Sequence, residues 1–346
     1  MMINLKNKKD PIFLMLVGIP SSGKTTIARE FMNEFNCIDA PIVHLSSDSL
    51  REELLGDINN QDNNKLIFDE MEKRTIDSLK ENKHVIYDAT NINRKKRKNI
   101  LNKLPKNTSK IACYMANNYD DILERNKNRD RTVPDRVILQ MYKRLQLPVY
   151  GEGWDNIIHV FDNEMENSVI QDVISNPIRI EALTNKSGYD FITFLSIYFN
   201  EFLDILDLPH DSKYHSLSVS RHTYYTYRYI LDNYDNKDVR NKEILIWSAL
   251  LHDLGKAKCK SFINRNGEEA RYANFINHEY VSAQIAVNIL YRLGFNDMFI
   301  YEVSTLVQYH MRLLNENVNK QKIKNELGED LFKLLEILRE ADMSAH

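Results

Sequence analysis

Two groups of residues in this sequence have the types and spacing needed for phosphate chemistry. The first begins at Gly18, where eight residues fit the pattern G-x-x-x-x-G-K-[ST]. A loop of this kind surrounds phosphate oxygens with backbone N–H groups, its lysine adds a positive charge, and its final hydroxyl can hold Mg²⁺. The residues expected to bind ATP or another NTP with Mg²⁺ are Gly18, Ser21, Ser22, Gly23, Lys24, Thr25 and Thr26.

Two acidic residues follow other apolar segments of the same half. Asp48 comes after PIVHLSS, and Asp88 ends HVIYD. In an open parallel sheet both would lie at the carboxyl ends of strands, beside the phosphate crevice. Asp48 could accept a hydroxyl proton there, or could equally cap the helix that follows it. Asp88 could contribute to the Mg²⁺ site or make only a structural hydrogen bond.

Three arginines further along could contact the transferring phosphate. Arg125, Arg129 and Arg131 come from a short helix and from a loop that Pro134 closes. This layout suits a lid, because a planar guanidinium group stabilises the charge on a phosphoryl group better than an ammonium group does. A solvent-facing helix is the alternative.

The second group, in the other half of the chain, consists of histidines and aspartates. Seven of the ten histidines follow residue 209, and the apolar-flanked string ALLHDLGK contains an ionisable pair that is costly to bury without a partner. Adjacent His and Asp, joined by others from neighbouring helices, can hold one or two metal ions that bind water and phosphate. A lone helical histidine is more often a packing residue. The members of this group are His222, His252, Asp253, His278, His310 and Asp342.

The elements that must position these residues differ between the two halves. Up to about residue 160, short β-rich runs alternate with helical patterns, which predicts a parallel sheet with helices on both faces. After a polar stretch with weak periodicity, apolar residues recur at helical spacing almost throughout. We expect an α/β domain at 1–165, a linker at 166–185 and an all-α bundle at 186–346.

Composition and charge narrow the classes of protein. With 43% hydrophobic and 27% charged residues and only 10 Gly and 8 Pro, the chain is neither disordered nor collagen-like. The three cysteines lie far apart, which argues against a disulfide framework and suits a reducing compartment. The apolar run near the N-terminus is too short to span a membrane. A cytoplasmic protein without a membrane partner is expected.

The charge is distributed unevenly along the chain. Residues 1–160 carry 26 Lys and Arg against 22 Asp and Glu, whereas residues 161–346 carry 20 against 27. Residues 91–110 contain eight basic residues and no acidic one. A polyanion would favour this stretch, although most charge runs are solvated helix faces.

The first half resembles the phage-type polynucleotide 5′-kinase family of P-loop phosphotransferases. The matching segments are GIPSSGKTT, SSDSLREEL, IYDATNINRKKR and ERNKNRDRTVPDRVILQMYKRLQLPVY, over roughly residues 10–160. The resemblance implies that Asp48 is the general base for a 5′-hydroxyl and that Arg51 contacts the phosphate next to the acceptor nucleoside. It also implies that Arg129 contacts the donor phosphates. Arg94 and Arg97 are expected to join Arg51 in binding nucleic acid.

The second half resembles the HD-domain metal-dependent phosphohydrolase superfamily, over about residues 186–346. The resemblance is carried by YHSLSVSRH, HDLGK, NHEYVSAQ and QYHMR. It implies one metal shell of His222, His252, Asp253 and Asp342, and a second of His278 and His310 with Asp253 bridging. It also implies phosphate contacts from His215, Lys256 and Arg312. Mn²⁺, Co²⁺, Ni²⁺ or Fe²⁺ are the expected ions, because imidazole-rich shells favour them over Mg²⁺ alone.

Together the two resemblances imply a bifunctional enzyme that heals nucleic-acid ends. The kinase half would phosphorylate a 5′-hydroxyl, and the HD half would remove a 2′,3′-cyclic phosphate or a 3′-phosphate. The expected partners are RNA ends, or DNA ends, and a separate RNA ligase that acts downstream. Two alternatives stay open: a small-molecule or nucleoside kinase fused to a mononucleotide phosphohydrolase, and a kinase with a regulatory nucleotide-binding HD module. Whether the chain forms a homodimer is also open.

Overall fold

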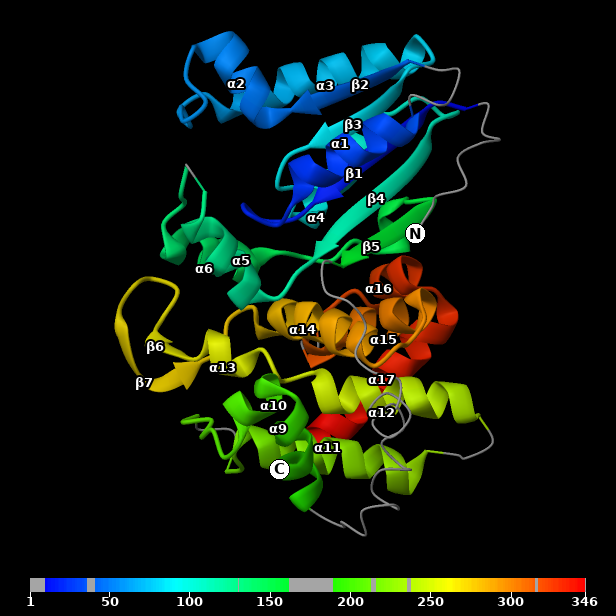
Figure 1. The fold of residues 1–346 in the computed structure, drawn as a ribbon. Helices are drawn as coiled ribbons and strands as arrows, with labels where there is room; N and C mark the ends of the chain where they lie inside the picture. Colours follow the sequence, from blue (N-terminus) through cyan, green and yellow to red (C-terminus); the bar gives the residue numbers. More distant parts are fainter. Residues whose placement is uncertain are drawn as a thin grey trace. The chain divides into compact units, whose positions relative to one another are not determined.

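The computed structural model describes residues 10–35, 41–129, 131–161, 189–212, 216–234, 238–314 and 317–345. The chain divides into two compact units (Figure 1). Unit 1 comprises Met1–Met141 and Pro148–Phe161, and unit 2 comprises Tyr142–Leu147 and Asp162–His346. The linker expected at 166–185 lies outside the described residues.

Unit 1 is built on a five-stranded parallel sheet, which confirms the predicted α/β class. The strand order is β2-β3-β1-β4-β5 and every neighbouring pair is parallel. All six residues of β1 are buried, as expected for a central strand covered on both sides. The strands are β1 (Ile12–Val17), β2 (Ile42–Ser46), β3 (His84–Asp88), β4 (Ser109–Ala116) and β5 (Asn156–Phe161).

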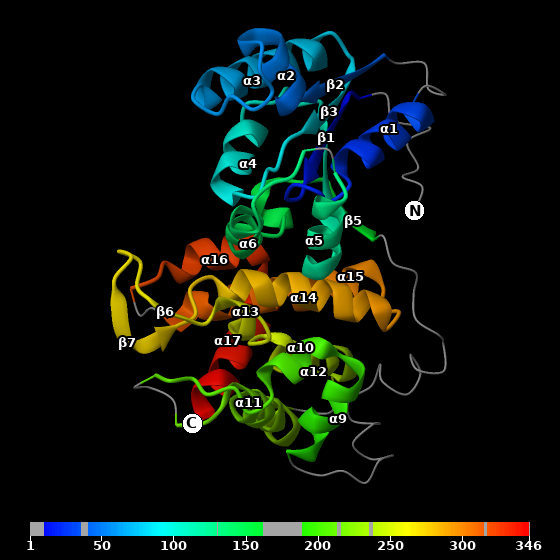
Figure 2. The same ribbon diagram turned by 60° about the vertical axis from the view of Figure 1, so that its left-hand side comes forward.

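Helices lie on both faces of this sheet. In Figure 2 the strands β1 and β3 lie between α4 on one side and α1 on the other. Helix α1 contributes Ala28 and Phe31 to a core formed with Leu14, Ile86 and Cys113 of the strands. The elements are α1 (Lys24–Phe35), α2 (Ser47–Leu55), α3 (Asn64–Lys80), α4 (Arg94–Leu101), α5 (Tyr119–Lys127), α6 (Asp135–Arg144) and the short 3₁₀ turn η1 (Tyr150–Glu152).

Unit 2 is predominantly helical, as predicted. Its last helix, α17, packs against α11, α12 and α15. The end of the chain therefore lies beside α11, which begins more than a hundred residues before α17. The helices are α9 (Asp190–Tyr198), α10 (Asn200–Ile205), α11 (Val219–Asn233), α12 (Val239–Leu251), α13 (Lys256–Cys259), α14 (His278–Arg292), α15 (Asp297–Tyr309), η2 (His310–Leu314), α16 (Lys320–Leu327) and α17 (Glu329–Ser344).

A β-hairpin interrupts the helices of unit 2, and the sequence patterns did not predict it. Strands β6 (Ser261–Ile263) and β7 (Glu269–Asn274) pair antiparallel. The turn between them contains Asn266 and Gly267, and Gly267 adopts a left-handed backbone with φ of 87°. An Asn-Gly pair between β-rich runs is a strong hairpin signal, so the sequence did contain the information.

No helix among the described residues is long and apolar enough to cross a membrane.

Candidate functional site

The phosphate-binding loop of unit 1 joins the end of β1 to the start of α1. Ser21 and Gly23 adopt φ values of 65° and 86°, and a Cβ on Gly18 would lie 2.5 Å from Ser22 Oγ. The loop therefore needs glycine at 18 and favours it at 23. Lys24 Nζ donates a hydrogen bond to the Ile19 carbonyl at 2.8 Å. Burial lowers the pKa of Lys24 to about 8, although the Asp88 and Asp48 carboxylates favour its charged form.

Asp88 lies at the end of β3, next to the first turn of α1. Its Oδ2 atom accepts a hydrogen bond from the Thr25 hydroxyl at 3.5 Å and lies 3.3 Å from His44 Nε2. A carboxylate and a hydroxyl at the mouth of a phosphate-binding loop are oxygen ligands of the kind that Mg²⁺ prefers. The geometry is compatible with both interpretations of Asp88, as a Mg²⁺ contact and as a structural hydrogen-bond acceptor.

The Asp48 side chain does not cap α2, which was one of the two roles that the sequence allowed for it. Ser46 is the N-cap of α2, and its hydroxyl accepts hydrogen bonds from the backbone N–H groups of Asp48 and Ser49. The Asp48 side chain is half exposed and lies 3.1 Å from Arg51 and 3.5 Å from Arg131. The two arginines hold the carboxylate in place from two directions. Asp48 is thus an accessible carboxylate near the loop lysine.

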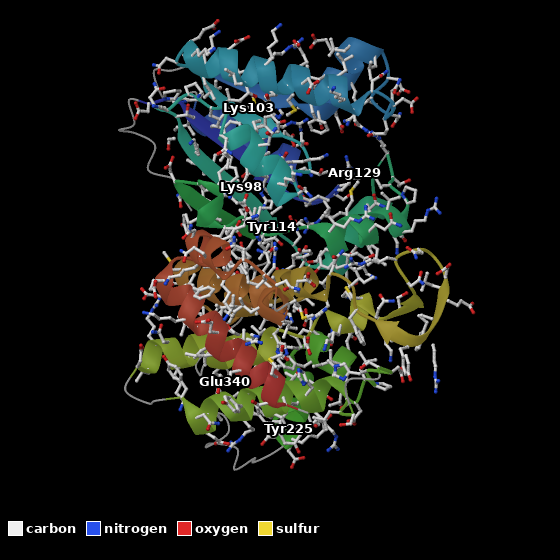
Figure 3. All side chains as sticks on the ribbon, turned by 180° about the vertical axis from the view of Figure 1, so that it is seen from behind. Lys98, Lys103, Tyr114, Arg129, Tyr225 and Glu340 are labelled. Carbon is white, nitrogen blue, oxygen red and sulfur yellow. The ribbon has the colours of Figure 1, made fainter. Side chains whose placement is uncertain are left out.

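The segment that carries the predicted lid arginines contacts the phosphate-binding loop. Arg129, labelled in Figure 3, donates a hydrogen bond to the Ser21 hydroxyl at 3.2 Å. Asn126 is buried in α5, accepts hydrogen bonds from Ser21 and from the Val133 N–H, and donates to the Val133 carbonyl. Asn126 therefore ties the loop after α5 to the phosphate-binding loop. Arg125 is half-buried in the last turn of α5.

Sequence reasoning did not single out Asn126, because an Asn between charged residues of a helix gives no signal of its own.

Arg94 and Arg97, which were expected to bind nucleic acid, lie inside unit 1 and not on its surface. Both are buried on one face of α4. Arg97 makes a two-pronged contact with Glu152, with nitrogen–oxygen distances of 2.8 and 2.7 Å, and Arg94 lies 3.5 Å from the same carboxylate. Their guanidinium groups hold α4 to η1 inside the fold. The exposed basic side chains of α4 are Lys95 and Lys96.

In unit 2 the predicted histidines and aspartates converge into two groups, each able to hold a metal ion. The first consists of His222, His252 and Asp342, and the second of Asp253, His278 and His310. Asp253 faces both groups. Its Oδ2 lies 3.6 Å from His222 Nε2 and 3.3 Å from His252 Nε2, while its Oδ1 lies 3.3 Å from His278 Nε2 and 3.9 Å from His310 Nε2.

The hydrogen bonds of the four rings fix which nitrogen faces the groups. Each Nδ1 lies 2.7–2.8 Å from a backbone carbonyl oxygen, which only accepts hydrogen bonds, so Nδ1 carries the proton. In the neutral ring Nε2 then presents a lone pair. His278 Nε2 and His310 Nε2 lie only 3.1 Å apart, and the buried His252 Nε2 has no hydrogen-bond partner among the described residues. Lone pairs and carboxylates arranged in this way fit divalent cations.

The electrostatics of the groups also favour cations. Burial alone would raise the pKa of Asp253, but His252 and Lys256 lower it well below its usual range. Burial opposes protonation of His252, yet Asp253 and Asp342 raise the pKa of this ring to about 10. Burial and the neighbouring rings of His278 and His252 lower the pKa of His310 to about 3. The carboxylates therefore create a field that attracts positive charge, either a second proton on His252 or a metal ion in place of that proton. His310 stays neutral and able to bind a metal.

Lys256 is held beside the shared carboxylate by a histidine that sequence reasoning did not single out. Its Nζ lies 2.7 Å from Asp253 Oδ2 and 2.9 Å from Nε2 of the buried His210. His210 Nδ1 lies 2.7 Å from the Leu217 carbonyl, which leaves Nε2 to accept from the ammonium group. Arg312 is exposed and packs over the Tyr309 ring, and His215 lies outside the described residues.

Gly255 allows the turn after α12 to approach the start of α14. A Cβ at Gly255 would lie 2.5 Å from the His278 carbonyl oxygen and 2.6 Å from the Ser282 backbone nitrogen. The Gly255 N–H donates to the Ser282 hydroxyl at 2.9 Å. The glycine of HDLGK is therefore what lets Asp253 meet His278.

The two groups border a pocket of about 520 Å³ in unit 2, within the size range of small-molecule sites. Asp253, His278, His310 and Asp342 line it together with Lys256 and His210. The hairpin contributes Arg265 and Ala273 to its wall, and apolar residues come from η2 (Met311 and Leu314) and from α17 (Met343).

Comparison with known families agrees with this geometry. Residues 13–148 match the AAA domain, and residues 213–344 match the HD domain. The chain joins an AAA-type P-loop domain to an HD domain. The phosphate-binding loop lies in the first match, and all six predicted metal ligands lie in the second. The predicted P-loop domain and HD domain, and their order along the chain, are thereby confirmed.

A curated relative and two solved structures are each similar to part of this chain. An L-seryl-tRNA(Sec) kinase from Methanococcus maripaludis is 26% identical over 151 residues, and the match spans 42% of this chain and about half of the relative, 56%. A chain of the Pnkp1/Rnl/Hen1 RNA repair complex is 21% identical with a TM-score of 0.36, covering 42% of this chain and 47% of its own. A fungal RNA kinase is 17% identical with a TM-score of 0.34, covering 67% and 61%.

Proposed function

We propose that the P-loop unit transfers a phosphoryl group from ATP and Mg²⁺ to the 5′-hydroxyl of a nucleic-acid end. The observation that carries this proposal is the Asp48 carboxylate, which is half exposed, released from capping by Ser46 and held by Arg51 and Arg131. In that position it accepts the hydroxyl proton, while Lys24 and Arg129 neutralise charge on the donor phosphates. The curated relative is named as a kinase that acts on a tRNA, which supports an acceptor carried on RNA.

Replacing Asp48 by Ala tests the kinase proposal. Loss of a positioned base lowers rates by roughly 10²–10⁴-fold. Asp48→Ala should therefore lose phosphate transfer from labelled ATP to a 5′-hydroxyl oligonucleotide and keep nearly the same affinity for ATP. Glu52→Ala, an exposed acid on the same helix, is the matched control and should stay fully active. Full activity of Asp48→Ala would remove the assignment, and equal activity on free nucleosides would favour a small-molecule kinase.

For the HD unit we propose metal-dependent removal of a 2′,3′-cyclic phosphate or a 3′-phosphate from the other end. The supporting observation is the shared carboxylate of Asp253, with one oxygen towards each histidine group. Two divalent cations, with Mn²⁺, Co²⁺, Ni²⁺ and Fe²⁺ as candidates, would activate water there and neutralise phosphate oxygens. Lys256 supplies a further positive charge from its place between Asp253 and His210. A separate RNA ligase would then seal the healed ends.

Replacing Asp253 by Ala tests the hydrolase proposal. The variant should lose metal-dependent phosphate release from a 3′-phosphorylated oligonucleotide, because both groups lose their common ligand. Asp48-dependent kinase activity should remain, which reports that unit 1 has folded, and an unchanged far-UV circular dichroism spectrum reports the same for the helices of unit 2. Asp232→Ala on α11, an exposed acid, serves as the control. Phosphate release that survives Asp253→Ala would sink the proposal, and binding of mononucleotides without turnover would favour a regulatory HD module.

A further inference from the structure

The hairpin of unit 2 contributes a positive charge to the pocket that contains the metal-ligand groups. Arg265, in the turn between β6 and β7, lines this pocket together with Asp253, His278 and Lys256. The carboxylates among its described lining residues are Asp253, Asp342 and Glu279, and none of them comes from the hairpin.

The turn that carries Arg265 is built around one side chain. The Asn264 Oδ1 atom accepts hydrogen bonds from the N–H groups of Asn266 and Glu268, and its Nδ2 donates to the Glu268 carboxylate at 2.9 Å. Glu268 is therefore engaged by Asn264. No hydrogen bond or ion pair of the Arg265 guanidinium is present among the described residues, and its side chain is exposed. The turn presents a guanidinium group whose donors are available to an anion.

The hairpin is attached to the segment that holds the pocket lysine. The Ala273 N–H donates to the Asp211 carbonyl at 3.0 Å, and Lys260 pairs with the Asp211 carboxylate at 2.6 Å. Asp211 follows His210, whose ring holds Lys256. The position of the hairpin is thus tied to the position of the lysine beside Asp253.

The pocket also has an apolar wall. Met311, Leu314 and Met343 line it and are 38%, 37% and 47% exposed. Such side chains can pack against a sugar and a base without reading the base by hydrogen bonds. The pocket thus combines one cation beside the metal ligands, an apolar surface and a second cation on the hairpin.

We infer that Arg265 binds the phosphodiester that precedes the terminal nucleotide, so that the HD unit selects polynucleotide 3′ ends over mononucleotides. This inference rests on the proposed hydrolase function. The terminal phosphate takes the place beside Asp253 and Lys256, and the terminal nucleoside packs on the apolar wall. The next phosphate reaches Arg265, whose planar fork matches two phosphate oxygens. A mononucleotide has no phosphate to occupy this last contact.

Arg265→Ala tests this subsite in the full chain. Its kcat/KM for a 3′-phosphorylated RNA oligonucleotide should fall about tenfold, as expected for loss of a charge-assisted hydrogen bond. Its kcat/KM for a nucleoside 3′-monophosphate should not change. Arg271→Ala is the matched control, because Arg271 lies in the same hairpin, stacks on Tyr272 and does not line the pocket. Arg265→Lys should recover part of the loss.

A binding measurement separates failure of this inference from failure of the proposed hydrolysis. For the same oligonucleotide, Arg265→Ala should lower the slope of log affinity against log salt by about 0.7, the value for one phosphate contact on a single strand. Arg271→Ala should keep the wild-type slope. If the wild type cleaves neither substrate, the hydrolase proposal fails while this slope still tests Arg265. Equal losses on both substrates, or an unchanged slope and unchanged kcat/KM, would overturn the inference.

Discussion

At the residue scale, Lys24 makes nucleotide binding sensitive to alkaline pH. Burial lowers its pKa to about 8, so the ammonium group is charged below that pH and loses its proton above it. Phosphates have their second pKa near 6 and stay fully ionised through this range. We expect the Kd for MgATP to change little between pH 6.5 and 7.5 and to rise up to about tenfold between pH 8 and 9, because each pH unit above the pKa removes tenfold of the charged form.

Isothermal titration across this range measures the effect, with Lys24→Arg as the control. The guanidinium group stays charged throughout, so this variant should show a flat profile even where its affinity is lower. A wild-type profile that is flat to pH 9 would show that the charge of Lys24 does not limit binding.

Some residues of the metal-ligand site could be recognised from the sequence, and others could not. HDLGK could be recognised because its spacing places His252, Asp253 and Gly255 on one helix end. The partner of Lys256 could not, because His210 and His215 stand five residues apart in a connecting segment without periodicity. Only the fold shows that His210 is the ring beside the lysine.

At the element scale, the basic residues of α4 lie on two different faces of the helix, one buried and one exposed. Arg94, Arg97 and Leu101 recur at helical spacing and are buried on one face, whereas Lys95 and Lys96 are exposed. A count of charges from 91 to 110 treats all of them alike. The period of 3.6 residues would have assigned the arginines to the face of Ile100 and Leu101. Their partner, Glu152, lies 55 residues beyond Arg97, and no local pattern predicts that pairing.

A pair of substitutions in α4 distinguishes these roles. Arg97→Ala leaves the buried Glu152 carboxylate without its main partner, which should lower the free energy of unfolding by about 3–5 kcal/mol. Lys95→Ala should change it by no more than about 0.5 kcal/mol, as is usual for exposed positions. Urea denaturation followed by circular dichroism measures both. Similar small losses in the two variants would contradict the structural role of Arg97.

At the scale of the whole molecule, the change from alternating strands and helices to helices alone predicted the two fold classes. The exact limits of the two units were less accessible to sequence reasoning. The segment Tyr142–Leu147 groups with unit 2 although β5 of unit 1 comes after it. Domain limits predicted from sequence assign consecutive residues to one domain. They therefore miss a segment that belongs to unit 2 but is followed by further residues of unit 1.

Two ligands should stabilise the two units separately. Saturation at about a hundred times the Kd adds about 2.7 kcal/mol to the unit that binds. MgADP should raise the temperature of one thermal transition, and this shift should be absent in Lys24→Ala. Mn²⁺ should raise the temperature of a second transition, and this shift should be smaller in His222→Ala, which keeps only the second histidine group intact. Scanning calorimetry of the full chain resolves both effects. A Mn²⁺ shift of the same size in His222→Ala as in the wild type would place the ion outside the first histidine group.

The backbone carbonyls behind the four histidine rings bear on how the site tolerates mutation. Ala249, Phe275, Val307 and Ala345 orient the rings through main-chain oxygen atoms. Every amino acid carries that oxygen, so a substitution at these supporting positions removes no ring partner provided that the helix keeps its path. Metal binding is therefore confined to six side chains, and the residues at these four supporting positions can be exchanged over evolutionary time without loss of a ring partner.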